Sequence, residues 1–160
     1  YYDNGEGFPA KGMYYCDESG GWKKLGGAIP NVKSVSATNK VCINGGSTAD
    51  LPSMSITMTT GNSEVLIFFS AEVAQGVVTD NQPIYFRLNI DGTDIATTER
   101  KVIDMVYWAD DSGAYFPTSI IHRATVAEGS HAFKVIWQGE GGGQCGCVEE
   151  RELIVVELNQ

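Results

Sequence analysis

The chain has 160 residues, of which 42% are hydrophobic and 19% are charged, and its formal net charge is −9. This balance indicates one globular domain rather than a disordered chain. Proteins that bind nucleic acid need clustered Lys and Arg, and only 11 basic residues stand here among 20 acidic ones, so we expect no nucleic-acid partner. The longest apolar run, Val65 to Phe69, is too short to cross a bilayer, and we therefore expect no membrane insertion.

The first thirty residues differ from the rest of the chain, and we call them the N-terminal arm. Its aromatic residues are Tyr1, Tyr2, Phe8, Tyr14, Tyr15 and Trp22, set among seven glycines. Residues 13–16 and 22–25, with turn-forming residues between them, predict a small hairpin. Because so many aromatic side chains on so short a segment cannot bury one another, we expect the arm to lie against its own domain or a neighbouring subunit.

Strand patterns follow one another from residue 31 onward. They cover residues 32–38, 53–60, 63–74, 83–91, 93–98, 101–108, 115–126, 131–138 and 148–158. In the clearest of them, Ile84, Phe86 and Leu88 occupy alternate positions, and Asp91-Gly92 after it is a strong hairpin signal. Eight or nine short strands with no helical period predict an all-β fold, an antiparallel β-sandwich over residues 31–160.

Two of these strands are apolar on both faces. Residues 65–69 and 153–156 lack the alternation that is expected of a strand with one wet side. Such a strand lies either at the centre of a packed structure or at a subunit interface. Because the outer face of a sandwich is normally wet, the pattern favours an interface between subunits.

Four cysteines, Cys16, Cys42, Cys145 and Cys147, form an even set. We expect disulfides, with Cys16 and Cys42 each bonded into the turn that holds Cys145 and Cys147, or else bonded to each other. Zinc is an alternative, but the one-residue gap between Cys145 and Cys147 suits its tetrahedral geometry poorly. Disulfides predict an extracellular protein, at a cell surface or on a virion surface.

Catalytic motifs are lacking. The only histidines are His122 and His131, and no nucleophile motif surrounds the cysteines. The adjacent acids Glu149 and Glu150 are interpreted as solvated charge, because neighbours on a strand point to opposite faces. Oxygen ligands for calcium occur in two segments, which hold Asp110, Asp111 and Ser112, and Asp3, Asn4 and Glu6. Neither segment forms an Asp-x-Asp-x-Asp-Gly loop, and we expect no enzyme activity, no metal ion and no cofactor.

Four strand segments, taken in order, resemble a known family. They are Val65 to Ser70, Tyr85 to Thr93, Gly129 to Trp137 and Leu153 to Leu158. Over about residues 53–158 the chain resembles the C-terminal jelly-roll heads of bacterial and phage fibre proteins, which are similar to the C1q and tumour-necrosis-factor fold. The resemblance implies a jelly roll over residues 31–160, preceded by the arm, and a structural or adhesive role in trimers or other assemblies.

We therefore predict a non-enzymatic structural subunit that assembles with itself into an extracellular filament or fibre, with the arm contacting a neighbouring subunit. A trimeric phage or bacterial fibre head is one alternative. The other is a carbohydrate-binding adhesion module, because aromatic side chains that cluster around one loop can stack on surface glycans. These possible glycan contacts are Tyr107, Trp108, Tyr115 and Phe116.

Overall fold

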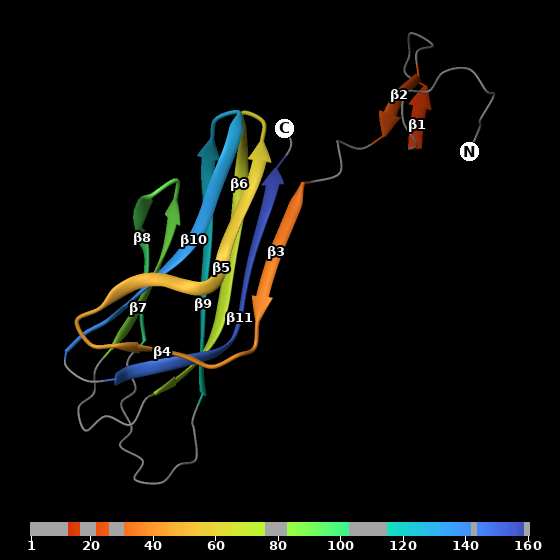
Figure 1. Cartoon of the computed structure of the whole chain (residues 1–160). Helices are drawn as coiled ribbons and strands as arrows, with labels where there is room; N and C mark the ends of the chain where they lie inside the picture. Colours follow the sequence, from red (N-terminus) through yellow and green to blue (C-terminus); the bar gives the residue numbers. More distant parts are fainter. Residues whose placement is uncertain are drawn as a thin grey trace.

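A computed structural model of the chain describes residues 13–16, 22–25, 31–75, 83–102, 115–141 and 144–158 (Figure 1). Throughout these ranges the regular structure is strand, with no helix, and the all-β prediction is confirmed. The strands are β1 (Met13–Cys16), β2 (Trp22–Leu25), β3 (Val32–Ala37), β4 (Val41–Asn44), β5 (Thr48–Thr60), β6 (Ser63–Gln75), β7 (Ile84–Ile90), β8 (Thr93–Val102), β9 (Tyr115–Val126), β10 (Gly129–Gly139) and β11 (Gln144–Leu158).

Two antiparallel sheets form a sandwich. The four-stranded sheet has the order β5-β10-β7-β8, and the five-stranded sheet has the order β3-β11-β6-β9, with β4 also paired to β11. The pairs are nested along the chain: β3 with β11, β5 with β10, β6 with β9, and β7 with β8. Each pair encloses the next in sequence and alternate pairs share a sheet, which is the arrangement of a jelly roll.

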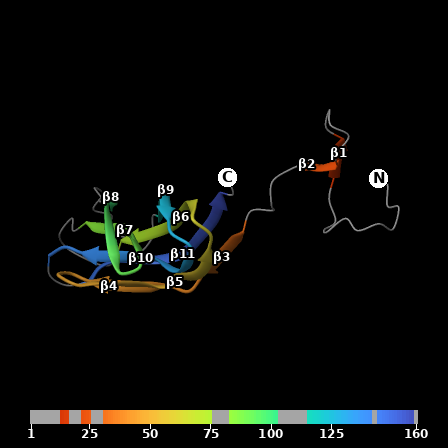
Figure 2. The same cartoon turned by 90° about the horizontal axis from the view of Figure 1, so that it is seen from above.

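The edges of the two sheets lie beside each other. Contacts join β3 to β5 on one side of the sandwich and β8 to β9 on the other. The view from above shows both sides (Figure 2). Because each edge strand has the other sheet alongside it, the broad outer faces are the larger surfaces open to a partner.

The core fills the space between the two inner faces, because alternate residues of each long strand point inward. The largest fully buried side chains are Phe69, Phe86, Phe133, Leu51, Met54, Met58, Ile67, Leu88, Ile120, Leu153, Val65 and Val135. Phe69 of β6 and Phe86 of β7 meet across the two sheets, with ring centroids 5.7 Å apart. Burial of such a side chain stabilises the fold by about 1.5–3 kcal/mol.

The observed strands differ from the predicted ones mainly around β4 and β5. No pattern predicted β4, because its four residues carry a single buried side chain, Ile43. Its position is fixed instead by pairing with β11. Strand β5 begins at Thr48, earlier than predicted, since Pro52 and Ser53 interrupt the apolar pattern and Ser53 has a positive φ of 65°.

Strand β8 is continuous where the sequence predicted separate strands over residues 93–98 and 101–108. A bulge explains the broken pattern, because Phe86 pairs with Arg100 whereas Leu88 pairs with Ile95. The buried hydroxyl of Thr98 accepts a hydrogen bond from the Leu88 N–H at 2.9 Å. Residues 103–108 lie outside the described ranges.

The hairpin of the N-terminal arm has the predicted pairing. β1 and β2 run antiparallel, with Met13 opposite Leu25 and Cys16 opposite Trp22. The other arm residues lie outside the described ranges. The division of the chain into an arm and a jelly roll at residue 30 therefore stays a prediction.

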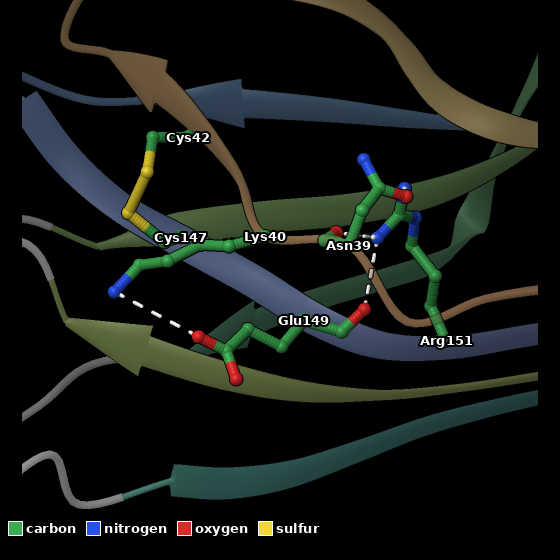
Figure 3. Close-up of a disulfide and its surroundings, with 6 residues drawn as sticks. All are labelled: Asn39, Lys40, Cys42, Cys147, Glu149 and Arg151. Carbon is green, nitrogen blue, oxygen red and sulfur yellow. Dashed lines mark hydrogen bonds and ion pairs between the residues drawn. A yellow bond between two sulfur atoms is a disulfide. The ribbon is translucent and has the colours of Figure 1, made fainter.

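A disulfide braces the five-stranded sheet. Cys42 of β4 and Cys147 of β11 lie opposite each other in the strand register and are joined through their sulfurs (Figure 3). The bond spans a sequence separation of 105 residues. This is one of the pairings that the sequence left open, Cys42 bonded into the turn of the last two cysteines. The side chains of Cys16 and Cys145 are outside the described part of the chain.

Candidate functional site

The outer face of the five-stranded sheet carries a contiguous group of apolar side chains. Cross-strand pairing places Ile154, Phe68 and Ile121 side by side on β11, β6 and β9. The next row along the sheet holds Val32, Val156 and Leu66. We call these six residues the apolar outer patch.

The patch is the second apolar face that the sequence indicated. On β6, Val65, Ile67 and Phe69 are buried in the core, whereas Leu66 and Phe68 between them are only half-buried. Strand β11 repeats this pattern. The two-sided apolar runs therefore face the core on one side and the outer surface on the other. The subunit interface that they favour stays a prediction.

Much of the patch is accessible to solvent in the single chain. Ile121 is 63% exposed and Val32 is 52% exposed. Between them lies a shallow hollow of about 460 Å³, lined in part by Phe68, Ile154 and Val156. Isolated apolar residues are common on protein surfaces, but contiguous apolar groups mark binding surfaces.

The same outer face becomes polar and acidic next to the patch. A second hollow, of about 720 Å³, is lined by Ser36, Ser70, Ser119, Glu72, Glu150 and Glu152 among others, and we call it the acidic hollow. Its Glu152–Ser70 pair is the next row after the Ile154–Phe68 pair, so the patch and the hollow form one continuous surface. The bulge of β11 lies here, and Figure 1 shows the strand bending below β3.

Three carboxylates of the acidic hollow have no counter-ion in the part of the chain that the structure describes. Among the described residues, no Lys, Arg or His forms an ion pair with Glu72, Glu150 or Glu152. The nearby Glu149 differs, because Lys40 Nζ lies 3.8 Å from its carboxylate (Figure 3). Like charges held together repel one another, so the hollow favours a cationic partner.

A buried arginine lies at the edge of the acidic hollow without neutralising it through an ion pair. Arg151 is only 3% exposed. Its Nη1 donates to the Asn39 carbonyl at 2.7 Å and to the Glu149 carbonyl at 2.9 Å, and its Nε donates to the Pro52 carbonyl at 3.0 Å. Figure 3 shows the contacts with Asn39 and Glu149. Burial lowers the pKa of Arg151. The guanidinium ties β11 to β5 and to the β3–β4 connection.

The chain enters the sandwich at the border of the patch. The Asn31 side chain donates to the Thr59 carbonyl at 2.9 Å and to Glu157 Oε2 at 3.3 Å. The other oxygen of Glu157 accepts from the Ser63 hydroxyl and the Gly61 N–H at 2.8 and 2.7 Å. These bonds, that from Ser63 first, lower the pKa of Glu157. The root of the arm is thus fixed one residue before Val32 of the patch.

The predicted glycan contacts do not form one aromatic platform in the described structure. Tyr115 is 42% exposed, and its hydroxyl interacts with Glu149, which raises the tyrosine pKa. Phe116 is half-buried and pairs with the core residue Val73, so it points to the other face of β9. Tyr107 and Trp108 lie outside the described ranges.

Metal ligands are not gathered in the part of the chain that the structure describes, where no group of three or more His, Cys, Asp or Glu residues could hold a metal ion. The calcium candidates of the sequence lie outside that part. Sequence reasoning missed the acidic hollow, because it considered Glu149 and Glu150 as neighbours on one strand. The pairing of β11 with β6 brings Glu150, Glu152 and Glu72 to one hollow. In the sequence, only the run of acids in residues 149–152 indicated this hollow.

Comparison with known proteins supports the fold. No known family matches the sequence, and no curated protein matches it closely enough to count as a relative. The VP2 subviral particle of infectious bursal disease virus matches 92% of this chain with 15% identity and a TM-score of 0.53. A chain of the T=1 particles derived from infectious bursal virus matches 94% with 16% identity and a TM-score of 0.50. This chain covers 36% of each viral chain.

A third match is a family 35 carbohydrate-binding module from Clostridium thermocellum. The match covers 79% of this chain and 98% of the module, with 11% identity and a TM-score of 0.37. This TM-score is too low to support a conclusion. At these identities the viral matches show a shared jelly-roll sandwich and nothing about activity. The resemblance to fibre heads stays a prediction.

Proposed function

We propose that the chain is a non-enzymatic structural subunit that assembles with copies of itself, burying the apolar outer patch against a neighbour. The observation that carries this proposal is the exposure of Ile121 and Val32 at the rim of a half-buried group that contains Phe68. Removing apolar surface from water yields about 25 cal/mol for each Å². A sheet face of this kind is stabilised when a second surface covers it.

The occupant of the patch in this proposal is the N-terminal arm of a neighbouring subunit. The arm carries aromatic side chains that can cover the apolar outer patch. The root of the arm at Asn31 is held beside the patch by a hydrogen bond to Glu157. Aromatic side chains supply large contact areas in interfaces. The outer face is a better target than a sheet edge, because each edge strand lies beside the other sheet.

An arm that reaches the next subunit makes a head-to-tail contact, which produces an open fibre unless rotation closes it into a ring. A filament is therefore the form we propose, and a closed trimeric fibre head is the alternative within the same class. The VP2 match comes from a subviral particle, which supports a role in assembly and does not distinguish the two forms. Symmetry in electron micrographs separates the two forms.

An extracellular or virion location fits this role. The Cys42–Cys147 disulfide is typical of oxidising compartments. In the described ranges no helix is long and apolar enough to span a membrane. A location outside the cytoplasm is part of the proposal.

The test replaces patch residues by charge in the full chain. Ile121→Glu and Phe68→Glu place a carboxylate on the outer face, so we expect the fold to persist, as judged by circular dichroism, and assembly to weaken at least about tenfold. Thr57→Glu is the matched control, because Thr57 is exposed on the outer face of the four-stranded sheet. Mass photometry over a concentration series gives the readout. Assembly by both patch variants at the wild-type concentration would contradict the proposal.

Carbohydrate binding is a second candidate function, favoured by the position of Tyr115. Its exposed ring stands on the outer face beside Pro117, which lines the acidic hollow. Hydroxyl and carboxylate groups bind sugar hydroxyls, and an aromatic ring can stack on a sugar. Loss of glycan-array signal in Tyr115→Ala and Trp108→Ala, with assembly unchanged, would support this function. No signal from the native protein would remove it.

A further inference from the structure

We infer that the acidic hollow binds the lysine strand of the arm hairpin, residues 22–25, from a neighbouring subunit, with one of Lys23 and Lys24 facing the hollow because neighbours on a strand point to opposite faces. This inference rests on the proposed function and deepens it, because it assigns a second half to the same docking surface. The apolar outer patch would take the aromatic residues of the arm. The acidic hollow would take its cationic strand and set the register between subunits.

The acidic hollow carries a group of negatively charged side chains. Glu72, Glu150 and Glu152 line one hollow and form no ion pair with any described cationic residue. The one arginine that lines it, Arg151, is buried and its donors are engaged by carbonyl groups. The surface therefore offers hydrogen-bond acceptors and negative charge, and it repels anionic partners.

The arm supplies complementary charge in one short strand. Residues 22–25 read Trp-Lys-Lys-Leu, and the paired strand 13–16 reads Met-Tyr-Tyr-Cys. The two strands together hold two lysines and no acid, whereas Asp17 and Glu18 stand in the connection between them. Opposite charges at an interface select partner and register.

The spacing of the two halves matches a strand of this length. Phe68 of the patch and Glu72 of the hollow are four residues apart on β6, about 13 Å at the rise of a strand. Residues two apart on a strand share a face and lie about 7 Å apart, so residues 22–25 present one apolar residue and one lysine to the same surface, and the long lysine side chain covers the remaining distance. A single hairpin can therefore contact the patch with an apolar residue and the hollow with a lysine.

The experiment is a charge exchange between two full-length variants. One carries Lys23→Glu with Lys24→Glu, and the other carries Glu150→Lys with Glu152→Lys. Each alone places like charges together, so we expect each to raise the concentration needed for assembly at least about tenfold. An equimolar mixture restores opposite charges between different subunits, and we expect it to assemble close to the wild-type concentration. Mass photometry and sedimentation follow both.

A control variant and three outcomes distinguish the inference from the proposed function. Arg100→Glu with Lys101→Glu makes the same change of charge on β8 of the other sheet and should leave assembly unchanged. If the two charge variants assemble like wild type while Ile121→Glu does not, the inference is wrong and the proposed function stands. If wild-type protein stays monomeric at every concentration, both are overturned. Loss in each variant without recovery in the mixture also overturns the inference.

Discussion

The two outer faces of the sandwich differ in chemistry although both are made of exposed strands. On the four-stranded sheet, Arg87 lies 2.9 Å from Asp94 and 3.4 Å from Glu99, and Lys134 lies 2.8 Å from Asp50. On the five-stranded sheet, the apolar outer patch lies beside the acidic hollow, whose Glu72, Glu150 and Glu152 form no ion pair with any described cationic residue. The first face pairs several of its charges with one another, and the second leaves apolar surface and negative charge for a partner.

The two sheets also differ in the contacts that stabilise them. The five-stranded sheet is braced from within by the Cys42–Cys147 disulfide and by the buried Arg151, at the end of the sheet that holds the acidic hollow. A rigid face keeps a docking surface in one shape, which lowers the entropic cost of association. The four-stranded face carries surface ion pairs, which are weakly stabilising.

The disulfide is expected to give the largest effect. Cys42→Ser removes a cross-link over about 100 residues, so we expect the free energy of unfolding to fall by about 2–5 kcal/mol. Urea unfolding of the variant and the wild type measures it. Addition of a reducing agent should destabilise the wild type more than the variant, because the variant has already lost this cross-link. Equal midpoints for oxidised and reduced wild type would show that the brace contributes nothing.

The buried arginine comes second. Arg151→Met removes a buried guanidinium that donates to three backbone carbonyls, and we expect a loss of about 1.5–3 kcal/mol because hydrogen bonds from a charged group are lost. Arg123→Met is the matched control, since Arg123 is largely exposed and pairs with Glu64 at the surface. Chemical denaturation compares the two. A larger loss in the control would contradict the role of Arg151.

Exchanging single residues between the two outer faces compares their roles in assembly, with smaller effects on the free energy of unfolding. Ile121→Thr makes the patch more polar, and Thr57→Ile makes the other outer face more apolar. We expect both to change the free energy of unfolding by less than about 1 kcal/mol, because both sites are exposed. Only Ile121→Thr should weaken assembly, as followed by sedimentation. Equal effects of the two changes on assembly would show that the faces are equivalent.

The smallest effect is a pH dependence at one end of the four-stranded sheet. His131 Nδ1 lies 2.6 Å from Asp91 Oδ2, and its Nε2 lies 3.0 Å from the Ala127 carbonyl. Both partners are acceptors, so only the doubly protonated imidazole can donate to both. Asp91 first, and then the Ala127 carbonyl, raises the His131 pKa above its usual 6.5. Glu128 in the β9–β10 turn is the nearest further acid along the chain.

The sign of this effect follows from the raised pKa. The stability that His131 contributes is fully present below about pH 6.5 and is lost as pH rises through its folded pKa. His131 first, and then the Ala132 N–H, lower the Asp91 pKa, so the pair also weakens as pH falls through that lowered value. Thermal unfolding between pH 5 and pH 9 measures the upper limb. His131→Gln should flatten it, and an unchanged slope would contradict the pairing.

The sequence predicted those parts of the fold that depend on local patterns. Alternation in residues 84–90 and 115–126 predicted strands that the structure contains, and two-sided apolar runs indicated the patch. Strand β4, by contrast, depends on its partner β11 and on Cys147. The acidic hollow depends on register, because Glu72 and Glu152 are 80 positions apart in the chain and come together only when β6 pairs with β11. Pairing over such separations is invisible to local patterns.

Self-assembly of the chain can be observed directly by negative-stain electron microscopy of the native, non-reduced protein. Samples above and below the assembly concentration found by mass photometry would be imaged together with Ile121→Glu. We expect filaments from the wild type and isolated particles from the variant. Isolated single-chain particles from the wild type at every concentration would contradict it.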